Sequence, residues 1–282
     1  MNARILAPAL LLTVIACSNP PANQEPAAAT TETAKDTAAV EAIDETKEFK
    51  FSMVLADIPS PLEIINVLGK SHARFDKGLT NGTANESRYT TSFKRGLNFG
   101  VYAIDLGYLA ANDQFGNIQT YYNTTKNLAG SLDATEGFNK VAASRIKNYA
   151  ENKDSVMKVV DEFYTQVDQY LRNNQRLQTA THMLVGGWVE SQYLTLNSVK
   201  GMENGEDLKK IKEQIFMQKL HLGKIVSVLK DYEKDKEFMP IITEMNALNS
   251  LYQAIPSSAS IDEATLASLT EKVTAVRGKI TN

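Results

Sequence analysis

Apolar residues recur at spacings of three and four over long stretches of this chain. Two of these rows consist of large aliphatic and aromatic side chains: Phe93, Leu97, Val101, Ile104 and Tyr108, and then Val156, Val160, Phe163, Val167 and Tyr170. This spacing places the apolar side chains on one face of an α-helix. No stretch alternates apolar and polar residues with β-branched enrichment over the length of a strand, so the pattern predicts an all-α protein.

Helix boundaries follow from capping residues and from turn-forming residues between the apolar rows. Residues 60–63 read Ser-Pro-Leu-Glu, which is a helix-start signal, and residues 260–263 read Ser-Ile-Asp-Glu. The predicted helices cover the ranges 60–75, 88–112, 114–130, 136–151, 154–174, 176–200, 206–236, 239–254 and 261–279. Because the connections are short, consecutive helices should be antiparallel, which predicts an up-down multi-helix bundle.

Small residues form a stripe along the predicted helix 88–112, at Gly96, Gly100, Ala103, Gly107 and Ala111. Each glycine costs about 1 kcal/mol relative to alanine inside a helix. The close approach of a neighbouring helix would offset that cost, so we expect this helix to be central. Gly186 and Gly187, inside the predicted helix 176–200, likewise indicate a kink or a tightly packed crossing.

The chain begins with a different pattern. Arg4 precedes an apolar run over residues 5–16, which is too short to cross a bilayer and has the length of the apolar part of a signal peptide. The run ends in Val-Ile-Ala-Cys at residues 14–17. These residues resemble the lipobox of bacterial lipoproteins, in which a branched apolar residue precedes the cysteine by three positions and a small residue stands directly before it.

The lipobox resemblance implies a lipid anchor. In that family the chain is cut before the cysteine and a diacylglyceryl group is attached to its sulfur, which implies a signal peptide over residues 1–16 and lipidation of Cys17. Two or three acyl chains hold a protein firmly on a membrane. Ser18 stands where an Asp favours inner-membrane retention in enterobacterial lipoproteins, so the outer membrane is expected. The alternative is an ordinary secretory signal in which the cysteine is incidental.

The segment after the cysteine is rich in Ala, Thr, Pro and Glu, and its first aromatic residue is Phe49. Such a segment buries too little apolar surface to offset its ordering entropy, so a disordered tether is predicted between the anchor and the body. The chain is therefore divided into a signal peptide (residues 1–16), a disordered tether (17–50) and an all-helical domain (51–282).

Composition narrows the range of partners. Of the 282 residues, 43% are hydrophobic and 22% are charged, and the 30 basic residues are spread among 33 acidic ones, with a net charge of -3. Binding to nucleic-acid phosphates needs clustered Lys and Arg, so no nucleic-acid partner is expected. The single cysteine excludes an intramolecular disulfide and a zinc site built on several thiolates.

Common catalytic motifs do not occur in the sequence, which has no glycine-rich dinucleotide or phosphate loop, no Gly-x-Ser-x-Gly elbow and no His-Glu-x-x-His. The di-iron motif of helical bundles needs Glu three residues before His, but Gly69, Thr179 and Gln218 occupy those positions. We therefore predict no catalytic residue, no metal ligand and no cofactor. An enzyme of unrecognised type stays an alternative, because helical folds can assemble a site from distant residues.

Two pairs of potential metal ligands have a spacing of four residues. His72 and Asp76 would share a face if the first predicted helix extended that far, and Met217 with His221 would suit a soft metal. The simpler interpretations are a surface pair in the first case and a core Met beside an exposed His in the second.

Asp105 interrupts an apolar helical row and lies three residues after Tyr102. A buried carboxylate needs a partner, which would be Arg95 or an arginine on another helix; the alternatives are an exposed edge or an internal ion pair. His182 and Trp188 lie on one predicted helix, on either side of its double glycine, and would either line a small pocket or pack in the core. The candidate ligand-binding residues are therefore Asp105, Tyr102, His182 and Trp188.

Residues 98–108 resemble a segment of uncharacterised Bacteroidetes lipoproteins. The similarity extends over about residues 60 to 130 and implies no known activity. With the anchor and the tether, the sequence predicts a membrane-anchored envelope lipoprotein whose helical body is a binding or scaffold module for an envelope protein. The alternative is a periplasmic bundle that binds a small ligand or metal, with Asp105, His182 and Trp188 around one cavity.

Overall fold

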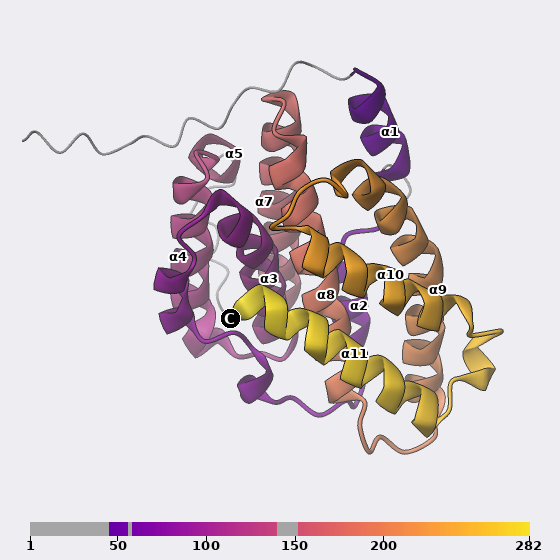
Figure 1. Cartoon of the computed structure of the whole chain (residues 1–282). Helices are drawn as coiled ribbons and strands as arrows, with labels where there is room; N and C mark the ends of the chain where they lie inside the picture. Colours follow the sequence, from indigo (N-terminus) through magenta and orange to yellow (C-terminus); the bar gives the residue numbers. More distant parts are fainter. Residues whose placement is uncertain (1–44, 56–57, 140–151) are drawn as a thin grey trace, which may run out of the picture. The chain divides into compact units, whose positions relative to one another are not determined.

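The computed structural model describes residues 45–55, 58–139 and 152–282, and over these residues the chain is helical without strands (Figure 1). The helices are α1 (Glu45–Leu55), α2 (Leu62–Gly69), α3 (Ser92–Ala111), α4 (Phe115–Ser131), α5 (Thr135–Asn139), α7 (Lys153–Asn173), α8 (Leu177–Ser198), α9 (Glu206–Leu229), α10 (Met239–Gln253) and α11 (Glu263–Thr281). Short 3-10 helices are η1 (Lys77–Leu79), η2 (Thr83–Arg88), η3 (Lys230–Tyr232) and η4 (Ser258–Ser260). The predicted signal peptide, Cys17 and most of the predicted tether lie outside the described residues, as does most of the helix expected over 136–151.

The described residues form a multi-helix bundle, as the sequence predicts, and helices joined by the shortest connections pack side by side. The connections between α3 and α4, between α4 and α5, and between α7 and α8 are each three residues long. Each of these tight corners holds a residue with positive φ: Asp113 at 57°, Asp133 at 51° and Gln175 at 60°. The short left-handed corner reverses the chain, so the following helix returns along the one before it.

α3 and α8 form the centre of the bundle, and they run in the same direction. Gly96 lies against His182, Gly100 lies against Gly187, and the Tyr108 hydroxyl is 3.2 Å from the Ser198 hydroxyl. Residue numbers therefore rise together along the contact. Every residue of α3 from Gly96 to Ala111 is buried, so the helix with the stripe of small residues is central, as the sequence predicts.

The glycines set how closely these two helices approach. A Cβ atom added at Gly186 would lie 1.9 Å from the Leu97 carbonyl oxygen, and one at Gly100 would lie 2.2 Å from the Met183 carbonyl oxygen. The obstructing atoms belong to the backbone, which no side-chain rotation can move aside. The double glycine of α8 is therefore a tightly packed crossing.

The structure differs from the predicted boundaries mainly before α3. The helix expected over 60–75 ends at Gly69, and residues 70–91 form a loop with two 3-10 helices. Gly69 ends α2 because its backbone abuts Ala111: an added Cβ would lie 2.6 Å from the Ala111 Cβ. At the other side of α2, part of the expected tether is helical, since α1 buries Phe51 and pairs Lys50 with Asp231 at 2.8 Å.

Among the described residues, no helix combines the length and the apolar character needed to cross a bilayer.

Candidate functional site

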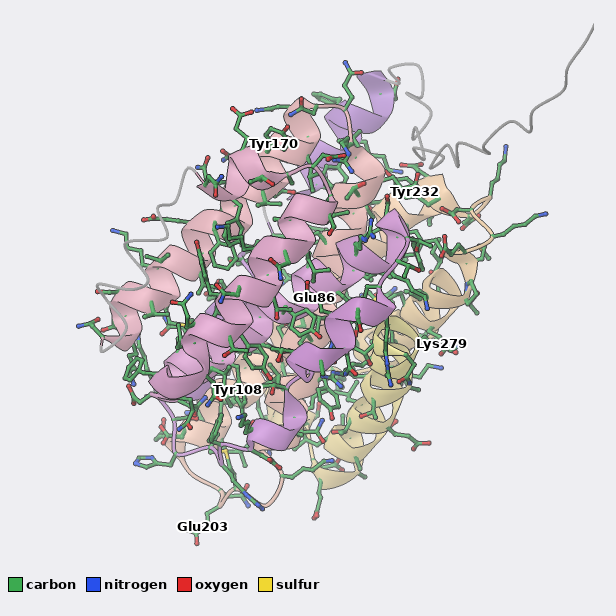
Figure 2. The ribbon with its side chains drawn as sticks, turned by 90° about the vertical axis from the view of Figure 1, so that its left-hand side faces the viewer. Glu86, Tyr108, Tyr170, Glu203, Tyr232 and Lys279 are labelled. Atoms are coloured by element: carbon green, nitrogen blue, oxygen red, sulfur yellow. The ribbon has the colours of Figure 1, made fainter. Side chains whose placement is uncertain are left out.

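A cluster of buried polar and charged side chains lies where the loop before α3 folds onto α3, α8 and α11. We call it the polar cluster, and its members are Asn81, Tyr89, Asn98, Asp105, Glu190 and Arg277. Glu86 of η2 and Lys279 of α11, both labelled in Figure 2, lie on the two elements that flank it. The cluster thus joins three parts of the chain that are far apart in sequence: α3 with the loop before it, α8 and α11.

Glu190 and Arg277 form the charged pair of the cluster. The Arg277 guanidinium donates from Nε to Glu190 Oε2 at 2.6 Å and from Nη2 to Oε1 at 2.9 Å. Glu190 is fully buried, and the guanidinium stacks over the Tyr193 ring at 4.1 Å and also donates to the Leu79 carbonyl oxygen at 3.0 Å. Burial alone would lower the pKa of Arg277, but the Glu190 carboxylate raises it above its ordinary value, so the guanidinium stays charged.

Asp105 lies beside this pair and is fully buried. Its Oδ2 accepts a hydrogen bond from the Asn81 backbone N–H at 2.9 Å, whereas no other group among the described residues donates to its buried Oδ1. The neighbour within hydrogen-bonding reach is Glu190, whose carboxylate is also an acceptor. Burial and the Glu190 charge raise the pKa of Asp105 well above its ordinary value, and Arg277 offsets only part of this rise.

The uncharged members of the cluster hold the end of α11. Asn98 Nδ2 donates to the Ile280 carbonyl oxygen at 2.9 Å, and the Tyr89 hydroxyl donates to the Thr281 carbonyl oxygen at 3.2 Å. Asn81 Nδ2 donates in turn to the Tyr89 hydroxyl at 2.9 Å. These bonds satisfy carbonyl groups of the last helical turn that have no partner within the helix.

The structure brings two of the four candidate ligand-binding residues into one neighbourhood. Tyr102 lies one turn from Asp105 on α3, and its hydroxyl donates to the Gly82 carbonyl oxygen at 2.9 Å. Trp188 lies elsewhere, because its Nε1 donates to Gln218 Oε1 at 2.9 Å and its ring contacts Tyr252.

His182 lies in a third place, between the rings of Phe93 and Phe238 at 4.9 and 4.7 Å between centroids. Neither of its buried ring nitrogens has a hydrogen-bond partner among the described residues. Burial lowers the pKa of His182 to about 4, so the ring is neutral near pH 7. The four candidates therefore occupy three separate clusters rather than the walls of one cavity.

Neither of the two possible metal pairs belongs to a larger set of potential ligands among the described residues. His72 Nδ1 is 2.5 Å from an Asp207 oxygen, while Asp76 caps η1 by accepting from the Gly78 N–H at 2.8 Å. Met217 is exposed, and His221 lies next to Gln218. Within the described residues, no three His, Cys, Asp or Glu side chains come close enough to hold a metal ion.

Sequence reasoning found Asp105 but missed the side chains that surround it. Of the proposed arginine partners, Arg95 is not the neighbour, since its Nε donates to the Tyr89 carbonyl oxygen at 3.0 Å. The arginine on another helix is Arg277, and Glu190 holds it. The available signal for Glu190 was its place in the apolar part of α8, two residues after Trp188.

The surface of the described residues has several openings. One of them, which we call the groove, has a volume of about 380 Å³ and is lined by Leu251, Ala254, Ile255, Pro256, Ser260, Ala264, Thr265, Ser268 and Leu269. It separates the end of α10 from the start of α11. A second cavity of about 250 Å³ lies beside α7, where Asp168 and Arg172 pair with each other at 2.8 Å.

Comparisons with known proteins add no family. No family model, no curated protein and no solved structure matches the chain.

Proposed function

We propose that this chain is a lipid-anchored protein of the bacterial envelope and that its helical body binds an apolar polypeptide segment of an envelope protein. The observation that carries the binding role is the groove between α10 and α11. Its lining contains no charged side chain, and its walls include buried Ile255 and Leu269 with Leu251 on the rim, 36% exposed. Apolar surface left in contact with water gains about 25 cal/mol per Å² when a partner covers it.

The shape of the groove favours a polypeptide. It runs between two helices, and amphipathic helices commonly dock their apolar face into such a space. Its volume of about 380 Å³ is at the lower end of the range for small-molecule sites, but it is open along the surface rather than enclosed. An apolar ridge of a few side chains therefore fits its chemistry better than a charged or strongly polar molecule.

The anchor supplies the location in this proposal. The Val-Ile-Ala-Cys sequence at residues 14–17 supports lipidation of Cys17, and the Ala-, Thr- and Pro-rich segment after it supports a tether. Confinement near the membrane raises the effective concentration at which envelope proteins meet the groove. A groove of modest affinity would then be sufficient.

The anchor is tested by feeding an alkyne-tagged fatty acid to bacteria that produce the wild type or Cys17→Ala. We expect the tag on the wild-type protein, which should remain with the membrane fraction, and no tag on the variant. An untagged wild-type protein released in the aqueous fraction would refute the anchor while leaving the groove open to its own test.

The groove is tested by site-specific photocrosslinking in the same cells. A photoreactive residue at Ser268, in the groove, should yield a discrete crosslinked product, whereas one at Asn123, exposed on α4, should not. The product should disappear when Leu251 on the rim is changed to Glu. Equal products from both positions, or a product indifferent to Leu251→Glu, would contradict the proposal.

The alternative of a small-ligand or metal-binding bundle requires Asp105, His182 and Trp188 around one cavity. Their three separate clusters give no such cavity among the described residues, so we do not extend the proposal to it.

A further inference from the structure

The polar cluster contains two carboxyl groups and one guanidinium. Asp105 and Glu190 are both fully buried, and Arg277 satisfies both oxygens of Glu190. If both carboxyls were ionised, the buried group would carry one negative charge in excess. A buried charge without a partner is strongly unfavourable, and the usual outcome is that the group becomes neutral instead.

The hydrogen bonds indicate which carboxyl oxygen would hold a neutralising proton. Among the described residues, the Asn81 backbone N–H is the only donor to Asp105, and it serves Oδ2. The nearby hydroxyls are already engaged, because Tyr102 donates to the Gly82 carbonyl oxygen and Tyr121 is bonded to the Thr80 hydroxyl. Asp105 Oδ1 and the adjacent carboxylate are therefore two acceptors with no hydrogen between them.

We propose that Asp105 carries a proton on Oδ1 at neutral pH and donates it to the Glu190 carboxylate, so that the polar cluster is a proton-binding site. The proton completes the hydrogen bonding of Oδ1 and removes the excess charge in one step. Glu190 then accepts from Arg277 and from Asp105, while Asp105 keeps its bond to Asn81.

The other ionisable groups near Asp105 do not supply the positive charge that would balance a second carboxylate. The groups that face it are Glu190 and Tyr193 from α8, Arg277 from α11, Tyr102 and Tyr108 from α3, and Tyr121 from α4. Burial raises the pKa of each of these four tyrosines, so they stay neutral well above pH 7. Arg277 is the single cation of the group, and Glu190 already holds it.

The bound proton has a structural consequence for the loop before α3. That loop is held through the same side chains, by the Asn81 N–H on Asp105 and by the Leu79 carbonyl oxygen on Arg277. Loss of the proton at alkaline pH places a second negative charge beside Glu190. We expect this to weaken the contacts of residues 79–81 before the rest of the bundle unfolds.

The test is an infrared measurement on the purified protein at neutral pH, supported by Asp105→Asn. A protonated carboxylic acid has a carbonyl stretching band at higher frequency than any carboxylate. We expect one such band in the wild type, its loss in Asp105→Asn, and its retention in Asp113→Asn, an exposed aspartate whose positive φ suits asparagine. The amide of Asp105→Asn replaces the acid closely, since it donates to Glu190 and still accepts from Asn81.

A second measurement distinguishes the effect of the bound proton on stability from any effect of altered packing in the variant. The wild-type urea midpoint should fall as pH rises from 7 to 9, above the range in which His182 titrates, whereas that of Asp105→Asn should change much less over the same range. The proposal is overturned by the absence of an acid band in the wild type, by a band that survives Asp105→Asn, or by a midpoint that depends on sodium concentration instead of pH. Because the wild-type spectrum alone can refute it, the test holds even if the variant folds poorly.

Discussion

Gly186→Ala should strongly destabilise the protein, although alanine is the better helix former. The added Cβ would lie 1.9 Å from the Leu97 carbonyl oxygen, 2.7 Å from the Leu97 carbonyl carbon and 3.0 Å from its Cα. Ordinary contact begins near 3.4 Å, so α3 and α8 would have to separate by about 1.5 Å at their crossing. Overpacking a core costs about 1 to 3 kcal/mol, and the gain in helix propensity is about 1 kcal/mol.

The packing cost should be at the upper end of that range, because backbone atoms block the methyl group and α3 is buried along its length, so the net loss after the gain in propensity should be about 2 kcal/mol. Urea unfolding followed by circular dichroism measures it, with an unchanged slope showing that the unfolded state is the same. The matched control is Gly116→Ala in α4, where an added Cβ meets nothing within 4 Å and should stabilise by up to about 1 kcal/mol. Equal stability of Gly186→Ala and the wild type would refute the glycine-dependent crossing.

Three further outcomes follow from single side chains. Glu190→Gln removes the carboxylate that holds buried Arg277 and should lower the free energy of unfolding, but by less than the cost of about 3 to 5 kcal/mol for an uncompensated buried charge, because Asp105 can then lose its proton beside Arg277. A loss below about 1 kcal/mol would show that the pair is not held as described. Burial lowers the pKa of His182 from 6.5 to about 4. As pH falls from 6.5 to about 4, the free energy of unfolding of the wild type should therefore decrease by about 1.4 kcal/mol per pH unit relative to that of His182→Leu. A stability difference between these two proteins that is independent of pH would argue against a buried neutral imidazole. Leu251→Glu, on the exposed rim of the groove, should change the free energy of unfolding by no more than about 0.5 kcal/mol while abolishing the Ser268 crosslink.

The helices could be predicted because their apolar periodicity is long and regular. The helix expected over 154–174 is observed at Lys153–Asn173, and the one expected over 239–254 is observed at Met239–Gln253. Residues 70–91 have no such periodicity, and their structure depends on contacts with α3 and α11 that local sequence does not reveal. Sequence reasoning therefore extended the first helix too far, and although it left residues 76–87 outside any helix, it did not reveal that Asn81 reaches the cluster.

The candidate site could be predicted only in part, because most of its contacts join residues that are far apart in sequence. Asp105 stood out because a carboxylate interrupts an apolar helical row, which is a local signal. Arg277 lies near the end of α11, in the last turns where a basic residue is ordinary at a helix C-terminus, so nothing local marks it as buried. Its bond to Glu190 joins residues 87 positions apart, and only the fold brings them together.

α11 links the two proposals physically. Its first turns, through Ala264 and Leu269, form one wall of the groove, and its last turns are held by the polar cluster through Arg277. Between Leu269 and Arg277 the helix advances by about 12 Å, at about 1.5 Å per residue, and a helix of this length transmits a displacement as a nearly rigid rod. Near its C-terminal half, α11 is also tied to α10 by Glu244, which pairs with Lys279 at 2.9 Å and with Lys272. We therefore expect a change in the charge of the cluster to act on the wall of the groove through one continuous element.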